Sequence, residues 1–266
     1  MTRIETAFDR LRRQGRRCFI AYLTAGDPSL ADTREYVLRL ADQGTDLVEL
    51  GLAFSDPLAD GRVNQAAAER ALAAGATLDR VLDAVSALRR ETEIPLVLYS
   101  YLNPLLARGF GPTLRRIAVA GFDGVLALDL PPEEAAAFQP DFANAGLNRI
   151  VLVAPTSDDR RIGRIVSGAG GFVYCISRAG VTGAQDRISD DAAEVLRRTR
   201  RHTALPLALG FGISTPDQAR EAAQLADAVV VGSALVQRLH DAGHNATARA
   251  VVFDWARSMA EAIHGA

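Results

Sequence analysis

Eight short apolar runs, separated by longer stretches with helical spacing, constrain the fold of this chain more than any other feature. Most of the runs recur roughly every 25 to 35 residues, and they are rich in Val, Ile, Leu and Phe. Near-continuous apolar runs are typical of parallel strands that are buried on both faces and joined by crossover helices. The runs begin at Cys18, Asp46, Ile94, Phe122, Asn148, Gly171, Leu205 and Ala226.

Eight strand and helix repeats fit a (β/α)8 barrel of the TIM type better than an open sheet. The intervening segments carry Thr, Asp or Glu near their starts, and two of them end in Gly, as helices do. The segment before the first run, TRIETAFDRLRRQG, predicts one additional amphipathic helix. One barrel takes about 250 residues, so we expect residues 1–266 to form a single α/β domain.

The composition narrows the partners and the location. A net charge of −2 gives no general attraction to nucleic acid or to an anionic membrane, so we expect neither as a partner. No apolar run reaches the roughly 18 residues of a membrane span, and the N-terminal segment lacks the apolar core of a signal peptide. We therefore expect a cytoplasmic protein. Cys18 and Cys175 lie in predicted strands, where we expect reduced core residues.

All 30 basic residues are arginine, and the lack of lysine excludes several reaction types. A Schiff-base aldolase, a pyridoxal phosphate enzyme and a P-loop nucleotide hydrolase each need a lysine amine, which a guanidinium group cannot replace. His240 and His244 are four residues apart, but the glutamate of the zinc motif is missing, so we expect no metal site. Bond chemistry must then rest on carboxyl groups, hydroxyl groups and backbone dipoles.

Glu49 is the clearest candidate for a chemical role. A TIM barrel gathers its active site at the C-terminal ends of the strands, and Glu49 lies within the run LVELG, between Val48 and Leu50. It must face the barrel interior or the helix layer, and either environment raises the pKa of its carboxyl. Such a carboxyl can stay protonated near neutral pH and act as an acid. The alternative is a buried structural acid that pairs with an arginine.

The loop after this run, LAFSDPLADGRVNQ, can supply a second acid at the mouth of the barrel. Its proline and glycine mark turns, and it carries Asp56 and Asp60. From position and chemistry alone, Asp60 is as compatible with a turn or N-cap residue as with a catalytic group.

Three glycine-containing loops late in the chain predict a phosphate site. SRAGVTGA, GFGIS and GSALV follow consecutive predicted strands, and TIM barrels build a phosphate cradle after strands seven and eight. Gly212 and Gly232 would let backbone N–H groups approach an oxyanion, and Ser233 could open a short helix whose positive end faces the phosphate. A set of ordinary turns is the alternative.

Four aromatic residues also lie at strand ends, where an apolar aromatic substrate could be held. Each of them could instead pack inside the barrel, and only their shared location favours a pocket. They are Tyr22, Tyr101, Tyr174 and Phe211.

Seven motifs, in their order and spacing, resemble the alpha subunit of tryptophan synthase over nearly the whole chain. FSDPLADG with an upstream VELG is highly specific to that family, whereas GFGIS and VGSA recur in other phosphate-binding barrels. The resemblance implies cleavage of indole-3-glycerol phosphate to indole and glyceraldehyde 3-phosphate, without a metal or an organic cofactor. Such a retro-aldol cleavage fits a lysine-free chain, because the indole ring protonated at C3 is its own electron sink. The motifs are LVELG, FSDPLADG, YLNP, DLPPEE, SRAGVTGA, GFGIS and VVGSALV.

The resemblance also implies roles for single residues. Glu49 would exchange a proton with ring carbon C3 and help to take the glycerol hydroxyl proton. Asp60 would bind the ring N–H and stabilise the positive charge that develops there. Tyr174 would lie beside the reacting glycerol group. The remaining residues would form the indole slot (Tyr22, Tyr101, Phe211), a lid after the sixth strand (Thr182) and the phosphate site (Gly183, Gly212, Gly232, Ser233).

The loop after the second predicted strand departs from the family pattern. Ala53 and Arg62 replace prolines, and Asn64 replaces a customary apolar residue. The loss of two prolines leaves the loop less pre-organised. In the family this loop contacts the beta subunit, which consumes indole, so an alpha2beta2 complex is a weaker expectation than the cleavage itself.

Three alternatives stay open at this point. The chain could be a stand-alone lyase that releases free indole to a secondary pathway, or a non-catalytic barrel that acts as a binding or regulatory subunit. Loss of an acid would mark the second case, and both Glu49 and Asp60 are present. A phosphoribosyl isomerase barrel would share the phosphate loops and an acid pair, but it would not explain FSDPLADG.

Overall fold

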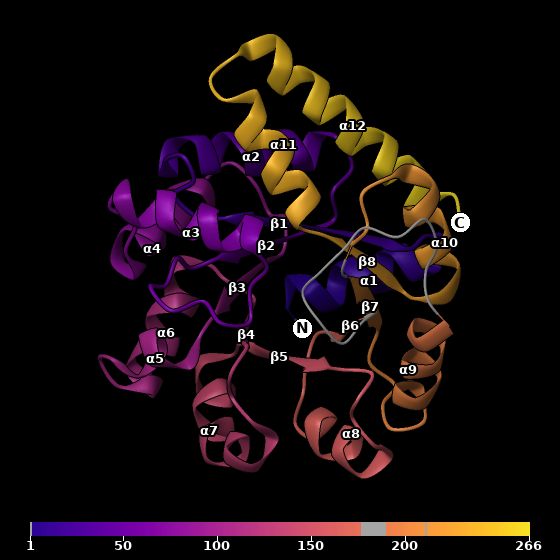
Figure 1. Cartoon of the computed structure of the whole chain (residues 1–266). Coiled ribbons are helices and arrows are strands. Elements are labelled where there is room, and N and C mark those ends of the chain that lie inside the picture. The colour runs from indigo at the N-terminus through magenta and orange to yellow at the C-terminus, as the bar shows by residue number, and fades with distance from the viewer. Residues whose placement is uncertain (1, 177–189, 211) are drawn as a thin grey trace.

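Eight parallel strands form a closed barrel in the order of the sequence (Figure 1). The computed structural model describes residues 2–176, 190–210 and 212–266. Each strand pairs with the next one along the chain, and the last strand pairs with the first. The predicted (β/α)8 barrel is confirmed. Its strands are β1 (Cys18–Thr24), β2 (Leu47–Gly51), β3 (Leu96–Ser100), β4 (Gly124–Ala127), β5 (Asn148–Val153), β6 (Val173–Ile176), β7 (Leu207–Gly210) and β8 (Ala228–Val231).

Helices surround the strands as an outer ring, and α12 packs outside α10 and α11 (Figure 1). Several begin at the polar residues that the sequence marks as caps. The side chains of Ser29, Thr77 and Thr215 each accept a hydrogen bond from the first turn of a helix, a contact that stabilises it by about 1 kcal/mol. The ring consists of α2 (Leu30–Asp42), α3 (Arg62–Ala73), α4 (Leu78–Leu88), α5 (Leu102–Leu106), α6 (Phe110–Ala120), α7 (Pro132–Ala145), α8 (Asp159–Val166), α9 (Asp190–Arg200), α10 (Pro216–Leu225), α11 (Ser233–Ala242) and α12 (Ala246–His264).

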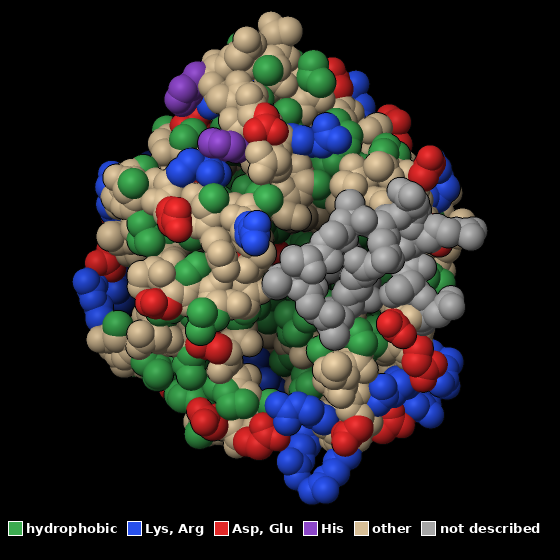
Figure 2. Space-filling view, in the orientation of Figure 1, with side chains coloured by type: hydrophobic (Ala, Val, Ile, Leu, Met, Phe, Trp, Pro, Cys, Tyr) green, Lys and Arg blue, Asp and Glu red, His purple; other side chains and the backbone are tan. Residues whose placement is uncertain are grey.

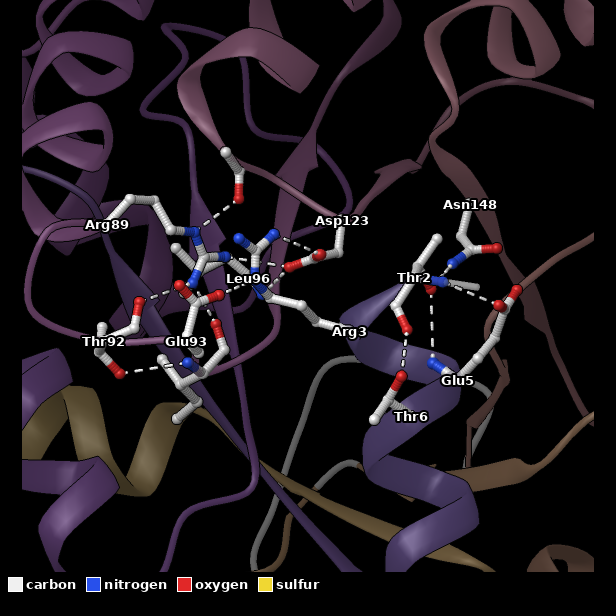
Figure 3. A network of polar contacts seen from close by, with 12 residues as sticks. Thr2, Arg3, Glu5, Thr6, Arg89, Thr92, Glu93, Leu96, Asp123 and Asn148 are labelled. Carbon is white, nitrogen blue, oxygen red and sulfur yellow. Dashed lines mark hydrogen bonds and ion pairs between the residues drawn. The ribbon is translucent and has the colours of Figure 1, made fainter.

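Helix α1 (Arg3–Arg13) closes the N-terminal end of the barrel. Its buried side chains Ile4, Phe8 and Leu11 belong to one apolar cluster with inward-facing residues from all eight strands. The hydroxyl oxygen of Thr2, which caps the helix, accepts a hydrogen bond from Asn148 Nδ2 at 2.7 Å (Figure 3). The additional N-terminal helix is therefore confirmed, and it seals the end of the barrel that lies opposite the expected active site.

Three aspartates at this end join neighbouring strands. The backbone N–H of each aspartate donates a hydrogen bond to the carbonyl oxygen of a residue on the neighbouring strand. The backbone N–H of that residue donates a hydrogen bond to the aspartate carboxylate in return. These residues belong to the turns, so the apolar runs predicted from positions 46, 122 and 226 start one or two residues before the actual strands. The pairs are Asp46 with Phe19, Asp123 with Leu96 (Figure 3), and Asp227 with Leu207.

Residues of alternate parity along each strand fill the barrel interior, and the others face the helices. Cys18 points inward and Cys175 outward, and both are buried free thiols, as predicted. Within the described part of the chain, no helix combines the length and the apolar character of a membrane span.

Candidate active site

Glu49 lies on β2 and faces the barrel interior. Leu47, two residues earlier on the strand, belongs to the interior cluster, and Glu49 pairs in register with Tyr22 on β1. The side chain is 1 % exposed, and burial raises the pKa of Glu49 to about 8. Among the described residues, its Oε1 atom has no hydrogen-bond partner and no arginine forms an ion pair with it. A structural acid would have such a partner.

Asp60 points into the mouth of the barrel from the loop after β2. Tyr99 donates a hydrogen bond to its Oδ1 atom at 3.0 Å, and Tyr101 donates one to its Oδ2 atom at 2.9 Å. Burial raises the pKa of Asp60, and the hydrogen bonds from Tyr101, Tyr99 and Asn64 oppose that effect. The N-cap of α3 is Gly61, so Asp60 does not cap that helix.

Tyr101 fixes the loop that carries Asp60. Its hydroxyl oxygen also accepts a hydrogen bond from the backbone N–H of Ala59 at 2.9 Å, and its ring lies 5.3 Å from that of Phe54. The Nε2 group of Gln65 donates to the Asp60 carbonyl at 2.8 Å. These contacts hold the loop although it has Ala53 and Arg62 in place of the prolines that the resemblance leads us to expect. Arg62 is the first residue of α3, a position that favours proline.

Two glycines make room for two tyrosine hydroxyls inside the mouth. A Cβ atom on Gly51 would lie 2.2 Å from the hydroxyl oxygen of Tyr22, and one on Gly210 would lie 2.3 Å from that of Tyr174. Burial raises the pKa of both tyrosines, and a charge on Glu49 raises it further, so both hydroxyls stay protonated beside this acid. The Tyr22 ring meets that of Tyr99 edge-on at 5.0 Å between centroids.

Part of the predicted phosphate site is described. Helix α11 begins at Ser233, as predicted, with Gly232 as its N-cap and no side-chain cap. A Cβ atom on Gly232 would lie 3.5 Å from the Cβ atom of Tyr22, so this helix start lies at the mouth of the barrel. Gly212 has a φ of +79°, which favours glycine. Thr182, Gly183 and Phe211 lie outside the described residues. Figure 2 shows a hollow near the centre of this face of the molecule, with hydrophobic side chains around it.

The structure adds contacts that the sequence reasoning missed. Tyr99 lies in a predicted strand, two residues before Tyr101, and this two-residue spacing could have identified it. In the sequence, Asn64 is only a departure from the family pattern, and its contact with Asp60 becomes visible in the folded chain. Gly51 and Gly210 make room for side chains that tilt toward them from neighbouring strands. A local sequence pattern does not contain this information. Among the described residues, no group of three His, Cys, Asp or Glu side chains could hold a metal ion.

Two buried carboxyl groups thus lie at the C-terminal end of a TIM barrel, among tyrosine hydroxyls and without a paired cation in the described part. This arrangement defines the class: a barrel enzyme equipped for acid–base chemistry. The family described as tryptophan synthase alpha chain matches residues 8–264. The chain belongs to this family, and the resemblance seen in its motifs is confirmed.

Relatives and solved structures agree with this assignment. Tryptophan synthase alpha chains of Geobacter sp. (strain M21) and Synechococcus elongatus are 48% and 47% identical; they cover 89% and 91% of this chain and 89% and 92% of their own lengths. Tryptophan synthase subunit alpha from Legionella pneumophila superposes with a TM-score of 0.90 at 34% identity, covering 99% of this chain and 98% of that one. An aminoacrylate-bound tryptophan synthase from M. tuberculosis gives 0.88 at 31% identity, covering 99% and 100%. The protein is therefore a lyase of tryptophan biosynthesis, and a phosphoribosyl isomerase is disfavoured.

Proposed function

We propose that the chain cleaves indole-3-glycerol phosphate to indole and glyceraldehyde 3-phosphate, with Glu49 and Asp60 as its catalytic carboxyl groups. The observation that carries this proposal is the isolation of Glu49. Its carboxyl has a pKa of about 8 because it is buried, and its Oε1 atom lacks a partner among the described residues. A group in that state holds a proton at neutral pH and can hand it to a carbon atom.

In this proposal Glu49 alone gives and takes back the proton that the cleavage requires. Its carboxyl protonates C3 of the indole ring, which moves positive charge to the ring nitrogen. The resulting carboxylate takes the proton of the glycerol hydroxyl while the bond between C3 and the glycerol carbon breaks, and an aldehyde forms. Glu49 ends as it began, and the electron pair of the broken bond returns to the indole ring. No lysine, metal or organic cofactor is needed in this scheme.

Asp60 would accept a hydrogen bond from the ring N–H and stabilise the charge there. Its own donors, Tyr99 and Tyr101, hold the carboxyl in place and favour its ionised form. Tyr174, whose pKa is raised by burial and by a charge on Glu49, would contact the reacting glycerol group. Tyr22 and Tyr101, together with Phe211, would line the indole slot.

The other end of the substrate would meet the start of α11. The helix dipole and the first backbone N–H groups, from Ser233 onward, favour an anion there. Gly212 and Gly232 keep side chains away from that anion. The roles of Thr182 as part of a lid and of Gly183 at the phosphate remain part of the same proposal.

A beta subunit in an alpha2beta2 complex would take up the indole in the cytoplasm. Support comes from Leu58, which is 90% exposed within the loop that carries Asp60. A single exposed apolar side chain is common on protein surfaces, so the family assignment is the stronger support for a beta subunit. The second candidate is a stand-alone lyase, which the replacement of both prolines at Ala53 and Arg62 favours. Turnover measured with and without the beta subunit of the same organism separates the two, because strong activation is expected only for a true alpha subunit.

Glu49→Gln tests the catalytic proposal most directly. Gln has nearly the same shape but no proton to give, so we expect turnover to fall by at least about 100-fold while binding of indole-3-glycerol phosphate persists. Indole release and calorimetric binding are the two measurements. The conservative control is Glu194→Gln, an exposed acid on α9, which should leave both unchanged. Equal turnover of wild type and Glu49→Gln would reject Glu49 as the acid.

A further inference from the structure

Asn64 carries a polar atom whose partner is missing from the described part of the chain. The residue lies partly buried in the first turn of α3, and its amide is close enough to the carboxyl of Asp60 to lower the pKa of that carboxyl by hydrogen bonding. A carboxylate only accepts hydrogen bonds, so the Nδ2 group of Asn64 must be the donor. The other amide atom, Oδ1, is buried and has no hydrogen-bond partner among the described residues.

The amide cannot correct this by turning over, because Oδ1 would then face the Asp60 carboxylate, acceptor against acceptor. The nearest donors around Asp60 are already used. The hydroxyl groups of Tyr99 and Tyr101 donate to the carboxyl, and Gln65 Nε2 donates to the backbone carbonyl of Asp60.

An unmet buried acceptor costs folding free energy. An apolar residue at this position would avoid that cost. A buried polar atom that the fold leaves unpaired is a candidate ligand contact. The same interpretation fits Glu49, whose Oε1 atom is also buried and has no hydrogen-bond partner among the described residues. Its carboxyl is the group proposed to exchange protons with the substrate.

We propose that Asn64 determines substrate specificity: its Oδ1 atom accepts a hydrogen bond from a hydroxyl or amino group on the six-membered ring of a substituted indole substrate. This inference rests on the proposed function. If Asp60 accepts the ring N–H, Asn64, whose Nδ2 group donates to the same carboxyl, lies on the side of the ring that carries this N–H. The ring edge beside the N–H, at positions 6 and 7, is then the part that Asn64 reaches. The substrate class is a hydroxy- or amino-indole-3-glycerol phosphate.

The reaction can be tested in the direction of synthesis. A substituted indole adds through C3 to the aldehyde carbon of glyceraldehyde 3-phosphate; the C3 proton moves to the protein and a proton is returned to the new hydroxyl group, so nothing else is consumed or released. Hydroxyindoles and methylindoles with the substituent at position 6 or 7 form matched pairs. Their groups are similar in size, and only the hydroxyl can donate to Asn64.

The experiment compares kcat/KM for each matched pair in the wild type, in Asn64→Leu and in Asn144→Leu. Asn144 is exposed on α7 and provides the same substitution away from the mouth. We expect the wild type and Asn144→Leu to favour the hydroxyindole by about tenfold at one of the two positions. Asn64→Leu should reduce that preference to about one, whatever its absolute rate. Calorimetric binding of the same pairs to the wild type gives a second measurement that needs no variant.

Each outcome decides the question. A wild type without preference, or a preference that survives in Asn64→Leu, overturns the role of Asn64. An equal loss with hydroxyindoles and methylindoles also overturns it, because Asn64 would then act only through Asp60. Failure of the proposed function looks different: no indole, substituted or not, would combine with glyceraldehyde 3-phosphate in any of the three proteins.

Discussion

The two ends of the barrel treat buried carboxyl groups in opposite ways. At the N-terminal end, Asp123 accepts hydrogen bonds from the Leu96 backbone N–H and from Arg89, and Arg3 pairs with it as well (Figure 3). Arginine or histidine side chains likewise pair with the other two aspartates of that end. At the C-terminal end, Glu49 and Asp60 are also buried, yet no cation among the described residues compensates them.

This difference assigns the acids at the N-terminal end to the stability of the fold and those at the C-terminal end to the proposed chemistry. A buried acid that pairs with an arginine and with a backbone N–H group joins neighbouring strands. A buried acid without a cation either keeps its proton or depends on a bound ligand for a partner, and it does not add to the free energy of unfolding. The same residue type therefore has a structural role at one end, and we propose a catalytic role at the other. Changes that neutralise an acid at each end test this division.

The largest effect on stability is expected at the N-terminal end. Asp123→Asn removes the charge that compensates Arg89, whose side chain is only 10 % exposed, and we expect a loss of about 3 kcal/mol in the free energy of unfolding. Glu49→Gln should cost less than about 1 kcal/mol at pH 7, because it replaces a neutral carboxyl by a neutral amide. Denaturant unfolding of both variants measures this. Turnover should respond in reverse, with Asp123→Asn retaining activity below its melting temperature. Equal costs at the two ends would end the distinction.

The pH dependence of Glu49 sharpens the comparison. The pKa of its carboxyl is ordinarily 4.5, and burial raises it to about 8. Between these values the folded protein holds a proton that the unfolded chain has lost, so this group lowers stability as pH rises from about 4.5 through 8. Activity should also decline above about pH 8, by roughly tenfold per pH unit, because the acid form disappears. A kcat/KM profile and unfolding curves at several pH values check both. Stability of Glu49→Gln should lack this decline, and an unchanged slope would contradict the assignment.

The sequence predicted the barrel and the positions of its acids better than their surroundings. Eight apolar runs and their spacing determine a closed barrel, because each run must be buried on both faces. The burial of Glu49 followed from Val48 and Leu50 on either side. Asp60 could not be separated from a turn residue, since its two tyrosine donors are 39 and 41 residues away in the chain. Contacts between strands are decided by register and by side-chain lean, which a local pattern does not contain.

The glycines beside the mouth offer a smaller test. A Cβ atom on Gly210 would collide with the hydroxyl group of Tyr174, so Gly210→Ala should displace this hydroxyl and cost about 1–3 kcal/mol. We expect kcat to fall by about tenfold, because Tyr174 would lie beside the reacting glycerol group. Gly163→Ala, in helix α8, is the matched control: its Cβ would meet only an ordinary contact at 3.6 Å, and helix propensity should raise stability by up to about 1 kcal/mol. Undiminished kcat in Gly210→Ala would remove Tyr174 from the mechanism.

The smallest effect on stability and activity is expected at Asp60, where tyrosine hydroxyl groups and no cation contact the carboxyl in the described part of the chain. Tyr99→Phe removes one of the donors that favour the ionised form of Asp60, so the pKa of Asp60 should rise further and the acidic limb of the kcat/KM profile should move to higher pH. The cost in stability should be about 1 kcal/mol. Tyr36→Phe is the control, because the buried Tyr36 hydroxyl has no hydrogen-bond partner among the described residues and its removal should be neutral or stabilising. An acidic limb that stays in place in Tyr99→Phe would mean that Asp60 does not depend on tyrosine donors, and the mouth would then need another source of compensation for its second carboxyl.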